Sequence, residues 1–257
     1  MIRSFNPSDP VQATPRGLPP MQIHCINLDR STDRLAAFAR VNAHLPDIIR
    51  VPAAEGATQD RAELITTGVI EDSVPYSAGA IGCALSHIAL WRHAVACQAP
   101  LTIAEDDAVF SHDAGAHFAA LSATLPADWE YVAWGYGFHN FIWIETLPGI
   151  SATEIRLHQG GLQEGFDHFQ ASTLRPSLFR LRHMFSTLCY SVSPRGAQRL
   201  LDFCIPLSAE HIGFPDFGIV IDNLGIDCKM NGIWPSMSAH IALPPIAIAS
   251  LQTSTIG

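Results

Sequence analysis

The chain has 257 residues, 48% of them hydrophobic and 15% charged, which is typical of a globular protein with a substantial core rather than a disordered chain. Its net charge of −9 leaves little basic surface for nucleic acid or an anionic bilayer, so we expect no nucleic-acid partner and at most peripheral membrane contact. We find no run of about 18 apolar residues that would cross a membrane, and six cysteines without a C-x-x-C pair indicate reduced thiols in a cytoplasmic protein.

The chain begins with 20 largely polar, proline-rich residues, which we expect to form a flexible tail before a single domain over residues 21–257. Residues 22–28 (Q-I-H-C-I-N-L) predict the first strand, and Ser31 is a candidate N-cap of the helix that follows. Residues 48–51 predict a second strand. This strand–turn–helix unit would place Arg30 and Arg34 beside a phosphate held by backbone N–H groups. The alternative is that both arginines are ordinary solvent-facing charges.

Residues 79–97 predict a long helix, because apolar residues recur there at intervals of three and four and Ser77 can cap the start. Gly79 and Gly82 in its first turns cost about 1 kcal/mol each relative to alanine. A helix accepts this cost where another backbone or a ligand must approach closely. His87 and His93 are six residues apart and cannot bind one metal from one helix face, so we interpret each as a hydrogen-bonded structural histidine.

Residues 101–110 contain the acidic motif at which we predict a cation-binding site. A short apolar strand ends there in three carboxylates, Glu105, Asp106 and Asp107. Side chains alternate along a strand, so Glu105 and Asp107 should point one way and Asp106 the other. Burying three carboxylates is costly unless a divalent cation offsets the repulsion, and oxygen ligands favour Mg²⁺ or Mn²⁺ over zinc. A solvated acidic turn is the alternative.

The rest of the chain continues the alternation of helices and strands. Residues 112–125 predict a helix, residues 129–134 and 186–192 predict strands, and Ser193-Pro194 begins a helix that extends to residue 204. Residues 138–182 form the least regular part. Aromatic side chains cluster around its start and could stack on sugar rings, but a place in the core is the favoured interpretation. They are Trp134, Tyr136, Phe138, His139, Phe141 and Trp143.

Taken in order, these segments resemble glycosyltransferase family 25, which includes bacterial lipopolysaccharide galactosyltransferases and procollagen galactosyltransferases. The matching motifs are I-N-L-D-R-S-x-x-R (26–34), G-A-I-G-C-A-L-S-H (79–87), E-D-D (105–107) and Y-S-V-S-P-R-G-A (190–197). An aspartate near the C-terminus and a Pro-Pro segment complete the set, which spans residues 22–257. The helix motif I-G-C-x-L-S-H combined with E-D-D is specific, whereas E-D-D alone is not.

The resemblance implies an α/β fold of the GT-A type, a Rossmann-like mixed sheet flanked by helices, and transfer of a sugar from a UDP-sugar with inversion. It makes Glu105, Asp106 and Asp107 the motif that holds the cofactor, Mn²⁺ or Mg²⁺. It also implies that the nucleotide pocket is shaped by Asn27, Leu28, Arg30, Arg34, Gly82, Ser86 and His87. Residues 186–187 are S-T where the family usually has G-T, and residues 138–182 match no better-known member, so no particular acceptor is implied.

Inversion requires a base that takes the proton of the acceptor hydroxyl. Asp227 is our first candidate, because G-I-D-x-x-x-N lies where the family has its C-terminal aspartate. Asp222 and His183 are the alternates. A purely structural role for Asp227 in the turn after Gly225 also stays open.

We therefore expect an enzyme that moves a hexose, galactose being the family's commonest, from UDP to a saccharide hydroxyl in lipopolysaccharide or another surface glycan. It would act in the cytoplasm or at the inner face of the membrane. A catalytically inactive binder of nucleotide sugars or glycans would keep the fold without the chemistry, but the intact motifs argue against it. A metal-dependent phosphohydrolase or nuclease would use the same carboxylates, but the net charge of −9 argues against a nucleic-acid groove.

Overall fold

The computed structural model of the chain describes residues 2–7, 18–137, 141–158, 162–214 and 218–250. Its strands are β1 (Ile2–Ser4), β2 (Gln22–Asn27), β3 (Asp47–Pro52), β4 (Leu101–Glu105), β5 (Ala108–Phe110), β6 (Tyr131–Tyr136), β7 (Phe141–Leu147), β8 (Ser151–Arg156), β9 (Ser177–Met184), β10 (Cys189–Val192), β11 (His211–Phe214), β12 (Ile219–Asp222), β13 (Ala239–Leu243) and β14 (Ala247–Ala249). Its helices are α1 (Thr32–Val41), α2 (Arg61–Thr66), α3 (Ala78–Cys97), α4 (Ala114–Ser122), α5 (Leu162–Ala171), α6 (Pro194–Cys204) and α7 (Ile226–Met230), with 3-10 turns η1 (Gly56–Thr58) and η3 (Trp234–Ser236).

Twelve of the described strands form one mixed sheet. Its parallel part has the order β1-β3-β2-β4, and the antiparallel strand β10 then joins β4 to β6. The sheet continues through β13, β9, β7 and β8, while β14 pairs with β5 and β6. Strands β3 and β4 both follow β2 in the chain and lie on opposite sides of it. This is a topological switch point, and open α/β sheets bind ligands at the carboxyl ends of the strands there.

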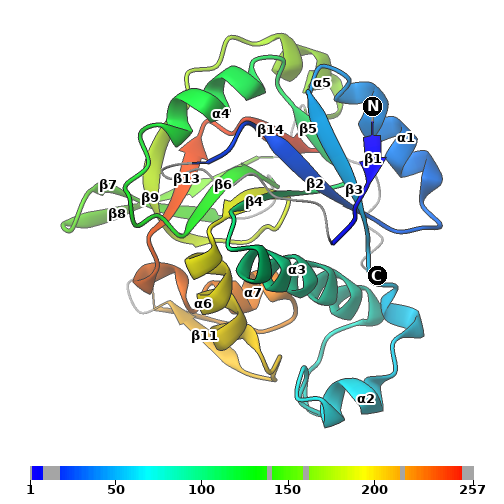
Figure 1. Ribbon diagram of the computed structural model, residues 1–257. Coiled ribbons are helices and arrows are strands. Elements are labelled where there is room, and N and C mark those ends of the chain that lie inside the picture. Colours follow the sequence, from blue (N-terminus) through cyan, green and yellow to red (C-terminus); the bar gives the residue numbers. More distant parts are fainter. Residues whose placement is uncertain (1, 8–17, 138–140, 159–161, 215–217, 251–257) are drawn as a thin grey trace.

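Helices cover both faces of the sheet, α1, α4 and α5 on one face and α3, α6 and α7 on the other (Figure 1). Strand side chains alternate between two hydrophobic clusters, so that Ile103 of β4 packs with Trp91 of α3 while Ala104 packs with Phe38 of α1 and Phe118 of α4. The sheet is thus filled from both sides. The prediction of a Rossmann-like mixed sheet flanked by helices is confirmed.

The helix that carries much of the site begins and ends where its sequence indicates. The Ser77 hydroxyl accepts a hydrogen bond from the Ala80 N–H at 3.2 Å, and Gln98 ends α3 with a left-handed backbone, φ +51°. By length and composition α3 could cross a membrane, but 56% of its apolar 18-residue stretch is buried inside the protein. A buried core helix meets the same criteria, and we interpret α3 as one.

Three irregular segments contain helices or strands, which corrects two expectations, that of a flexible tail and that of an irregular stretch over residues 138–182. Residues 2–5 are not a flexible tail, since β1 pairs in parallel with β3 and the Phe5 N–H donates to the Arg50 carbonyl at 2.8 Å; residues 8–17 lie outside the described part. The segment 53–77 contains α2, capped by the Asp60 carboxylate. The segment 138–182 contains the β7–β8 hairpin and β9. Strand β8 is largely polar and exposed, so its pairing with β7, and not a hydrophobic pattern, makes it a strand.

Three of the aromatic side chains near this segment, Trp134, Tyr136 and Trp143, lie in the core, as interpreted, and each is at most 1% exposed. Phe141 is partly buried. Phe138 and His139 lie outside the described residues. All six cysteines are free thiols in the structure. Three of them, Cys25, Cys189 and Cys204, are buried, and the others are partly exposed.

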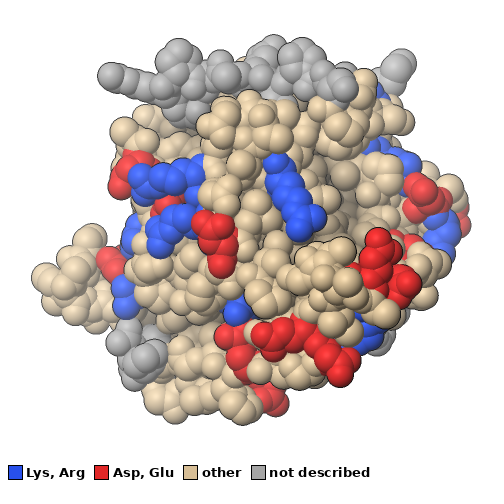
Figure 2. Space-filling model, turned by 60° about the horizontal axis from the view of Figure 1, so that its bottom comes forward, with Lys and Arg blue, Asp and Glu red and all other residues tan. Residues whose placement is uncertain are grey.

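Charged side chains on the surface are distributed in small groups. The side of the molecule that carries α3, α6 and α7 comes forward in Figure 2. Asp and Glu side chains gather along its lower edge, while the Lys and Arg side chains visible in this view lie in separate short groups. On this face, the described residues therefore form no continuous basic stripe.

Candidate active site

Two pockets open at the carboxyl ends of β2 and β4, on either side of the E-D-D turn. The first has a volume of about 330 Å³ and lies between the loop after β2 and the first half of α3. The second has a volume of about 510 Å³ and lies between the turn, the loop before β10 and the start of α7. Glu105 and Cys83 line both pockets. These two residues therefore form the wall where the pockets meet.

The first pocket brings together all seven residues that the sequence predicts for nucleotide binding. They are Asn27, Leu28, Arg30, Arg34, Gly82, Ser86 and His87. They come from the loop after β2, from the first turn of α1 and from the first three turns of α3, segments about 50 residues apart in the chain. Their contribution to ligand binding stays a prediction, but their convergence at the switch point is what such a role requires.

Gly82 and Ser86 hold a wall of this pocket in place. A Cβ atom at Gly82 would lie 2.5 Å from the Ala54 carbonyl oxygen and 2.8 Å from the Gly56 nitrogen. The Ser86 hydroxyl accepts from the Ala54 N–H at 2.9 Å and donates to the Gly82 carbonyl at 2.7 Å. The expected close approach at Gly82 is therefore made by the backbone of residues 54–56, which α3 positions as the far wall of the pocket.

The three carboxylates of the E-D-D motif point to three different surroundings. Glu105 faces α3, and Asp106 faces α1, as the alternation along a strand predicts. Asp106 accepts from Arg34 Nε at 2.9 Å with Oδ1 and from Asn27 Nδ2 at 2.7 Å with Oδ2. Both oxygens of Asp106 are thus already engaged by protein donors. Its evident role is to orient Arg34, and it is the least available of the three as a metal ligand.

Asp107 lies on the second pocket and is the carboxylate that best fits a cation. Among the described residues its buried Oδ1 has no hydrogen-bond partner, and its Oδ2 lies 3.9 Å from Arg34. Burial, with the negative charge of Glu105 adding to it, raises the pKa of Asp107 to about 7, against the opposing effect of Arg34. A divalent cation at this oxygen would offset both effects, so the residue fits the Mn²⁺ or Mg²⁺ that the resemblance implies.

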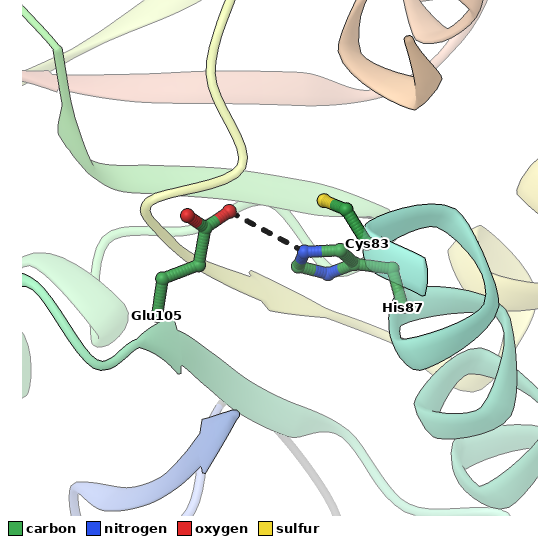
Figure 3. Close-up of side chains that lie close together, drawn as sticks. All are labelled: Cys83, His87 and Glu105. Atoms are coloured by element: carbon green, nitrogen blue, oxygen red, sulfur yellow. Dashed lines mark ion pairs between the residues drawn. The ribbon is translucent and has the colours of Figure 1, made fainter. Parts of the chain in front are cut away.

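Glu105 is held by a chain of buried polar groups. Its Oε1 accepts from the Thr187 hydroxyl at 2.5 Å and lies 3.5 Å from His87 Nε2 (Figure 3). Burial tends to raise the pKa of Glu105, but the hydrogen bonds from His87 and Thr187 outweigh it and lower the pKa below its ordinary value. Glu105 is therefore an ionised carboxylate at the wall between the pockets.

The far side of His87 is fixed as well. His87 Nδ1 shares a hydrogen bond of 2.8 Å with the Tyr190 hydroxyl, which also accepts from Trp91 Nε1 at 2.8 Å. All three side chains are buried. The interpretation of His87 as a hydrogen-bonded histidine is confirmed, and it lines the first pocket at the same time.

Of the three candidates for a catalytic base, the structure brings one to the pockets. Asp227 lies in the first turn of α7 and lines the second pocket, as Asp107 does. Its Oδ1 accepts from the Cys228 N–H at 2.9 Å, and burial, with Glu105 adding to it, raises its pKa. Asp222 is exposed on β12, 2.9 Å from His211, and His183 is buried in β9 against Trp143 and Phe214. Neither lines either pocket.

Sequence reasoning missed two residues that organise the site. Thr187 donates to Glu105, and Glu55 forms an ion pair with Arg30. Thr187 belongs to the S-T dipeptide that stands where the family usually has G-T. That difference marks the position as unusual but does not indicate a contact with Glu105. Glu55 comes from a loop without periodicity, and nothing in the sequence places it beside an arginine 25 residues earlier.

The fold and the two pockets define an α/β protein with two neighbouring pockets at a switch point of its sheet. A family model described as Glycosyltransferase family 25 (LPS biosynthesis protein) matches residues 21–212. The chain belongs to glycosyltransferase family 25. Membership supports a glycosyltransferase role in lipopolysaccharide biosynthesis. A comparison with curated proteins gives no match. Asp227 and the C-terminal wall of the second pocket lie beyond the matched residues.

Proposed function

We propose that this chain transfers a hexose, with inversion, from a UDP-sugar to a saccharide hydroxyl, with the nucleotide in the first pocket and the acceptor in the second. The observation that carries the proposal is the shared wall between two pockets of different character. The first is lined by two arginines, by the N-terminal turns of two helices and by carboxylates that pair with the arginines. The second is lined by the carboxylates Asp107 and Asp227, and no lysine or arginine is among its described lining residues. A UDP-sugar in the first pocket whose sugar reaches the wall at Cys83 and Glu105 would there meet an acceptor bound in the second pocket.

The first pocket suits a diphosphate. The first turn of α1 has no side-chain cap from Ser31, so the N-cap residue does not compete with an anion for its backbone N–H groups. Ala78 and Gly79 at the start of α3 line the same pocket, which brings a second helix N-terminus to it. Arg34 contributes a guanidinium that Asp106 holds in place. Together these groups supply hydrogen-bond donors for the phosphates of a nucleotide sugar, next to the carboxylates Glu55 and Asp106 that hold the arginines.

In the proposed reaction, the acceptor oxygen bonds to the anomeric carbon as the bond from that carbon to the β-phosphate oxygen breaks. Asp227 takes the proton of the acceptor hydroxyl, because it lines the acceptor pocket and its raised pKa makes it a better base than an exposed aspartate. UDP leaves with the bonding electrons. Asp107 would hold a Mn²⁺ or Mg²⁺, which supplies positive charge to the departing diphosphate. Glu105, ionised at the wall, orients groups around it.

We further propose that the fold is of the GT-A type, that galactose is the sugar, and that the enzyme works in the cytoplasm or at the inner face of the membrane. Its partners would be the UDP-sugar and a saccharide acceptor, with no nucleic acid and only peripheral membrane contact. These statements rest on the resemblance described above and on the net charge of −9.

The test is a UDP-release assay of the purified protein with a panel of UDP-sugars, with Mn²⁺ or Mg²⁺ and with chelator. We expect slow, metal-dependent UDP release from one sugar of the panel even without acceptor, because water can replace the acceptor hydroxyl. Thermal shift with UDP plus Mn²⁺ gives an independent readout, since a ligand of the native state raises its apparent stability.

Other outcomes would identify the alternatives. Binding of UDP without release from any sugar would point to an inactive binder or to an absolute need for acceptor, which added glycans would resolve. Phosphate release from simple phosphoesters, without selectivity for UDP, would indicate a phosphohydrolase. Silence in both assays would contradict the proposal.

A further inference from the structure

We propose that Cys83, His87 and Glu105 form a second cation site at the wall between the pockets, one that takes a borderline-soft divalent ion such as Zn²⁺. It would be distinct from the oxygen-ligand site at Asp107, although it lies beside it. No motif of the sequence assigns these three residues to one ion.

The three side chains converge from two elements. Cys83 and His87 are four residues apart on α3 and therefore lie side by side on one face of the helix. Glu105 reaches them from the end of β4 (Figure 3). Their sulfur, nitrogen and oxygen ligand atoms all lie within 4.8 Å of one another. His87 Nε2 and Glu105 Oε1 are 3.5 Å apart, close to the roughly 3.4 Å that separates two ligands at about 2.1 Å from a tetrahedral zinc ion.

The chemistry of the donor set selects the ion. One thiolate, one imidazole and one carboxylate are ligands that Zn²⁺ accepts together, whereas Mg²⁺ and Mn²⁺ prefer oxygen. Asp107 offers only oxygen, and it lines the second pocket but not the first. The site at Cys83, His87 and Glu105 would therefore prefer Zn²⁺, and the site at Asp107 would prefer Mg²⁺ or Mn²⁺.

The groups around the three residues match the second shell of a metal site. A metal-binding histidine usually anchors its other ring nitrogen to a hydrogen-bond partner, which fixes ring orientation and tautomer. Here the Tyr190 hydroxyl lies 2.8 Å from His87 Nδ1, and Trp91 Nε1 orients that hydroxyl in turn. In the metal-bound form Nδ1 would carry the proton and donate to the Tyr190 hydroxyl, while Nε2, which donates to Glu105 in the metal-free form, would give up its proton and bind the ion. The Thr187 hydroxyl orients the carboxylate in the same way.

The site would retain an open position. Three protein ligands leave a fourth tetrahedral position, and Cys83 and Glu105 border both pockets. An oxygen of water or of a bound ligand could therefore complete the coordination from either pocket. The alternative is a metal-free arrangement in which His87 Nε2–H donates to Glu105 and Cys83 is a bystander.

A cobalt titration distinguishes the two. Co²⁺ replaces Zn²⁺ in such sites and reports a bound thiolate by a near-ultraviolet charge-transfer band and by intense visible bands when tetrahedral. We expect one equivalent of Co²⁺ to produce both in the wild-type protein, kept reduced with a phosphine, and Zn²⁺ to abolish them. Cys83→Ser should lose the charge-transfer band and weaken Co²⁺ binding at least 10-fold. Cys228→Ser, a thiol on the wall of the second pocket outside the triad, should retain the band.

Two results would overturn the inference: a wild-type protein without the charge-transfer band at millimolar Co²⁺, or a band that persists in Cys83→Ser. If Cys83→Ser does not fold, Glu105→Gln provides the second variant and should weaken Co²⁺ binding while leaving the thiolate band at saturating metal. The readout is a spectrum and not turnover, so failure here and failure of the transferase proposal are separate results.

Discussion

Three consecutive carboxylates have different surroundings because β4 ends at Glu105 and the chain turns at Asp106 and Asp107. Glu105 meets His87 and Thr187, Asp106 meets Arg34, and Asp107 keeps a buried oxygen without a hydrogen-bond partner in the described part of the chain. A buried carboxylate in this state lowers stability. The residue whose surroundings are least favourable for folding is therefore the one that best fits a cation.

Asp107→Asn tests this assignment. The amide keeps the shape but removes the charge that would bind the cation, so we expect metal-dependent UDP release to fall at least 100-fold. The melting temperature in chelator should stay equal or rise, because the variant removes a buried carboxylate with one oxygen that lacks a hydrogen-bond partner among the described residues. Turnover and thermal unfolding of the same sample measure both. Full turnover in Asp107→Asn would remove this residue from the cation site.

Asp227→Asn tests the base. Because the amide cannot accept the acceptor proton, kcat for transfer should fall at least 100-fold while KM for the UDP-sugar changes little. Asp222→Asn is the matched control. Asp222 is exposed and lines neither pocket, so its variant should turn over normally. The reverse pattern, loss in Asp222→Asn with Asp227→Asn active, would reinstate the alternate candidate.

At the scale of elements, the site depends on how closely α3 approaches the loop after β3. Gly56 and Gly82 allow this: a Cβ at Gly56 would lie 1.7 Å from the Ala78 carbonyl oxygen, and one at Gly82 would lie 2.5 Å from the Ala54 carbonyl oxygen. The loop and helix together form one side of the first pocket. Helix propensity would favour alanine at residue 82, but tertiary packing requires glycine.

Gly82→Ala should therefore destabilise the protein by about 1–3 kcal/mol, because backbone atoms must move to admit the methyl group. Gly115→Ala is the control, since Gly115 also lies in a helix, α4, and a Cβ there would meet nothing within 4 Å. Its stability should be unchanged or raised by up to about 1 kcal/mol. Urea unfolding of both variants measures the difference. Equal stabilities would show that α3 and the loop can separate without cost.

At the scale of the whole molecule, the central sheet carries a buried titratable group that lines neither pocket of the candidate site. His24 of β2 is 2% exposed, and its Nδ1 lies 3.2 Å from the Thr102 carbonyl oxygen on β4. Burial, only partly opposed by this hydrogen bond, lowers the pKa of His24 from 6.5 to about 4. Between these values the unfolded chain binds the proton and the folded chain does not, so the free energy of unfolding falls as the pH decreases.

Because of His24, we expect the free energy of unfolding to fall by about 3 kcal/mol as the pH decreases through the interval from 6.5 to 4. The full decrease is reached only below pH 4. His24→Asn, which retains a donor near Nδ1, should flatten the pH dependence of urea unfolding in this interval. Part of the slope should remain, because burial also lowers the pKa values of His44, His93 and His240. An unchanged slope would show that His24 is not the main acid-sensitive group.

The sequence by itself determined the features that short-range patterns encode. Helical periodicity and capping residues predict α3 and α6, and apolar runs predict β2, β4 and β6. The motifs of the first pocket are also visible in the sequence, because each motif spans only a few consecutive residues. The residues that meet across the sheet were decided only by tertiary structure. Pairing with β3 and β7 made strands of residues 2–4 and 151–156, against weak local patterns. Folding also gave Asp106 and Asp107 different surroundings and brought Cys83 and His87 next to Glu105. It left Asp222 and His183 outside both pockets. These contacts depend on how helices and strands pack, which the distance along the chain does not determine.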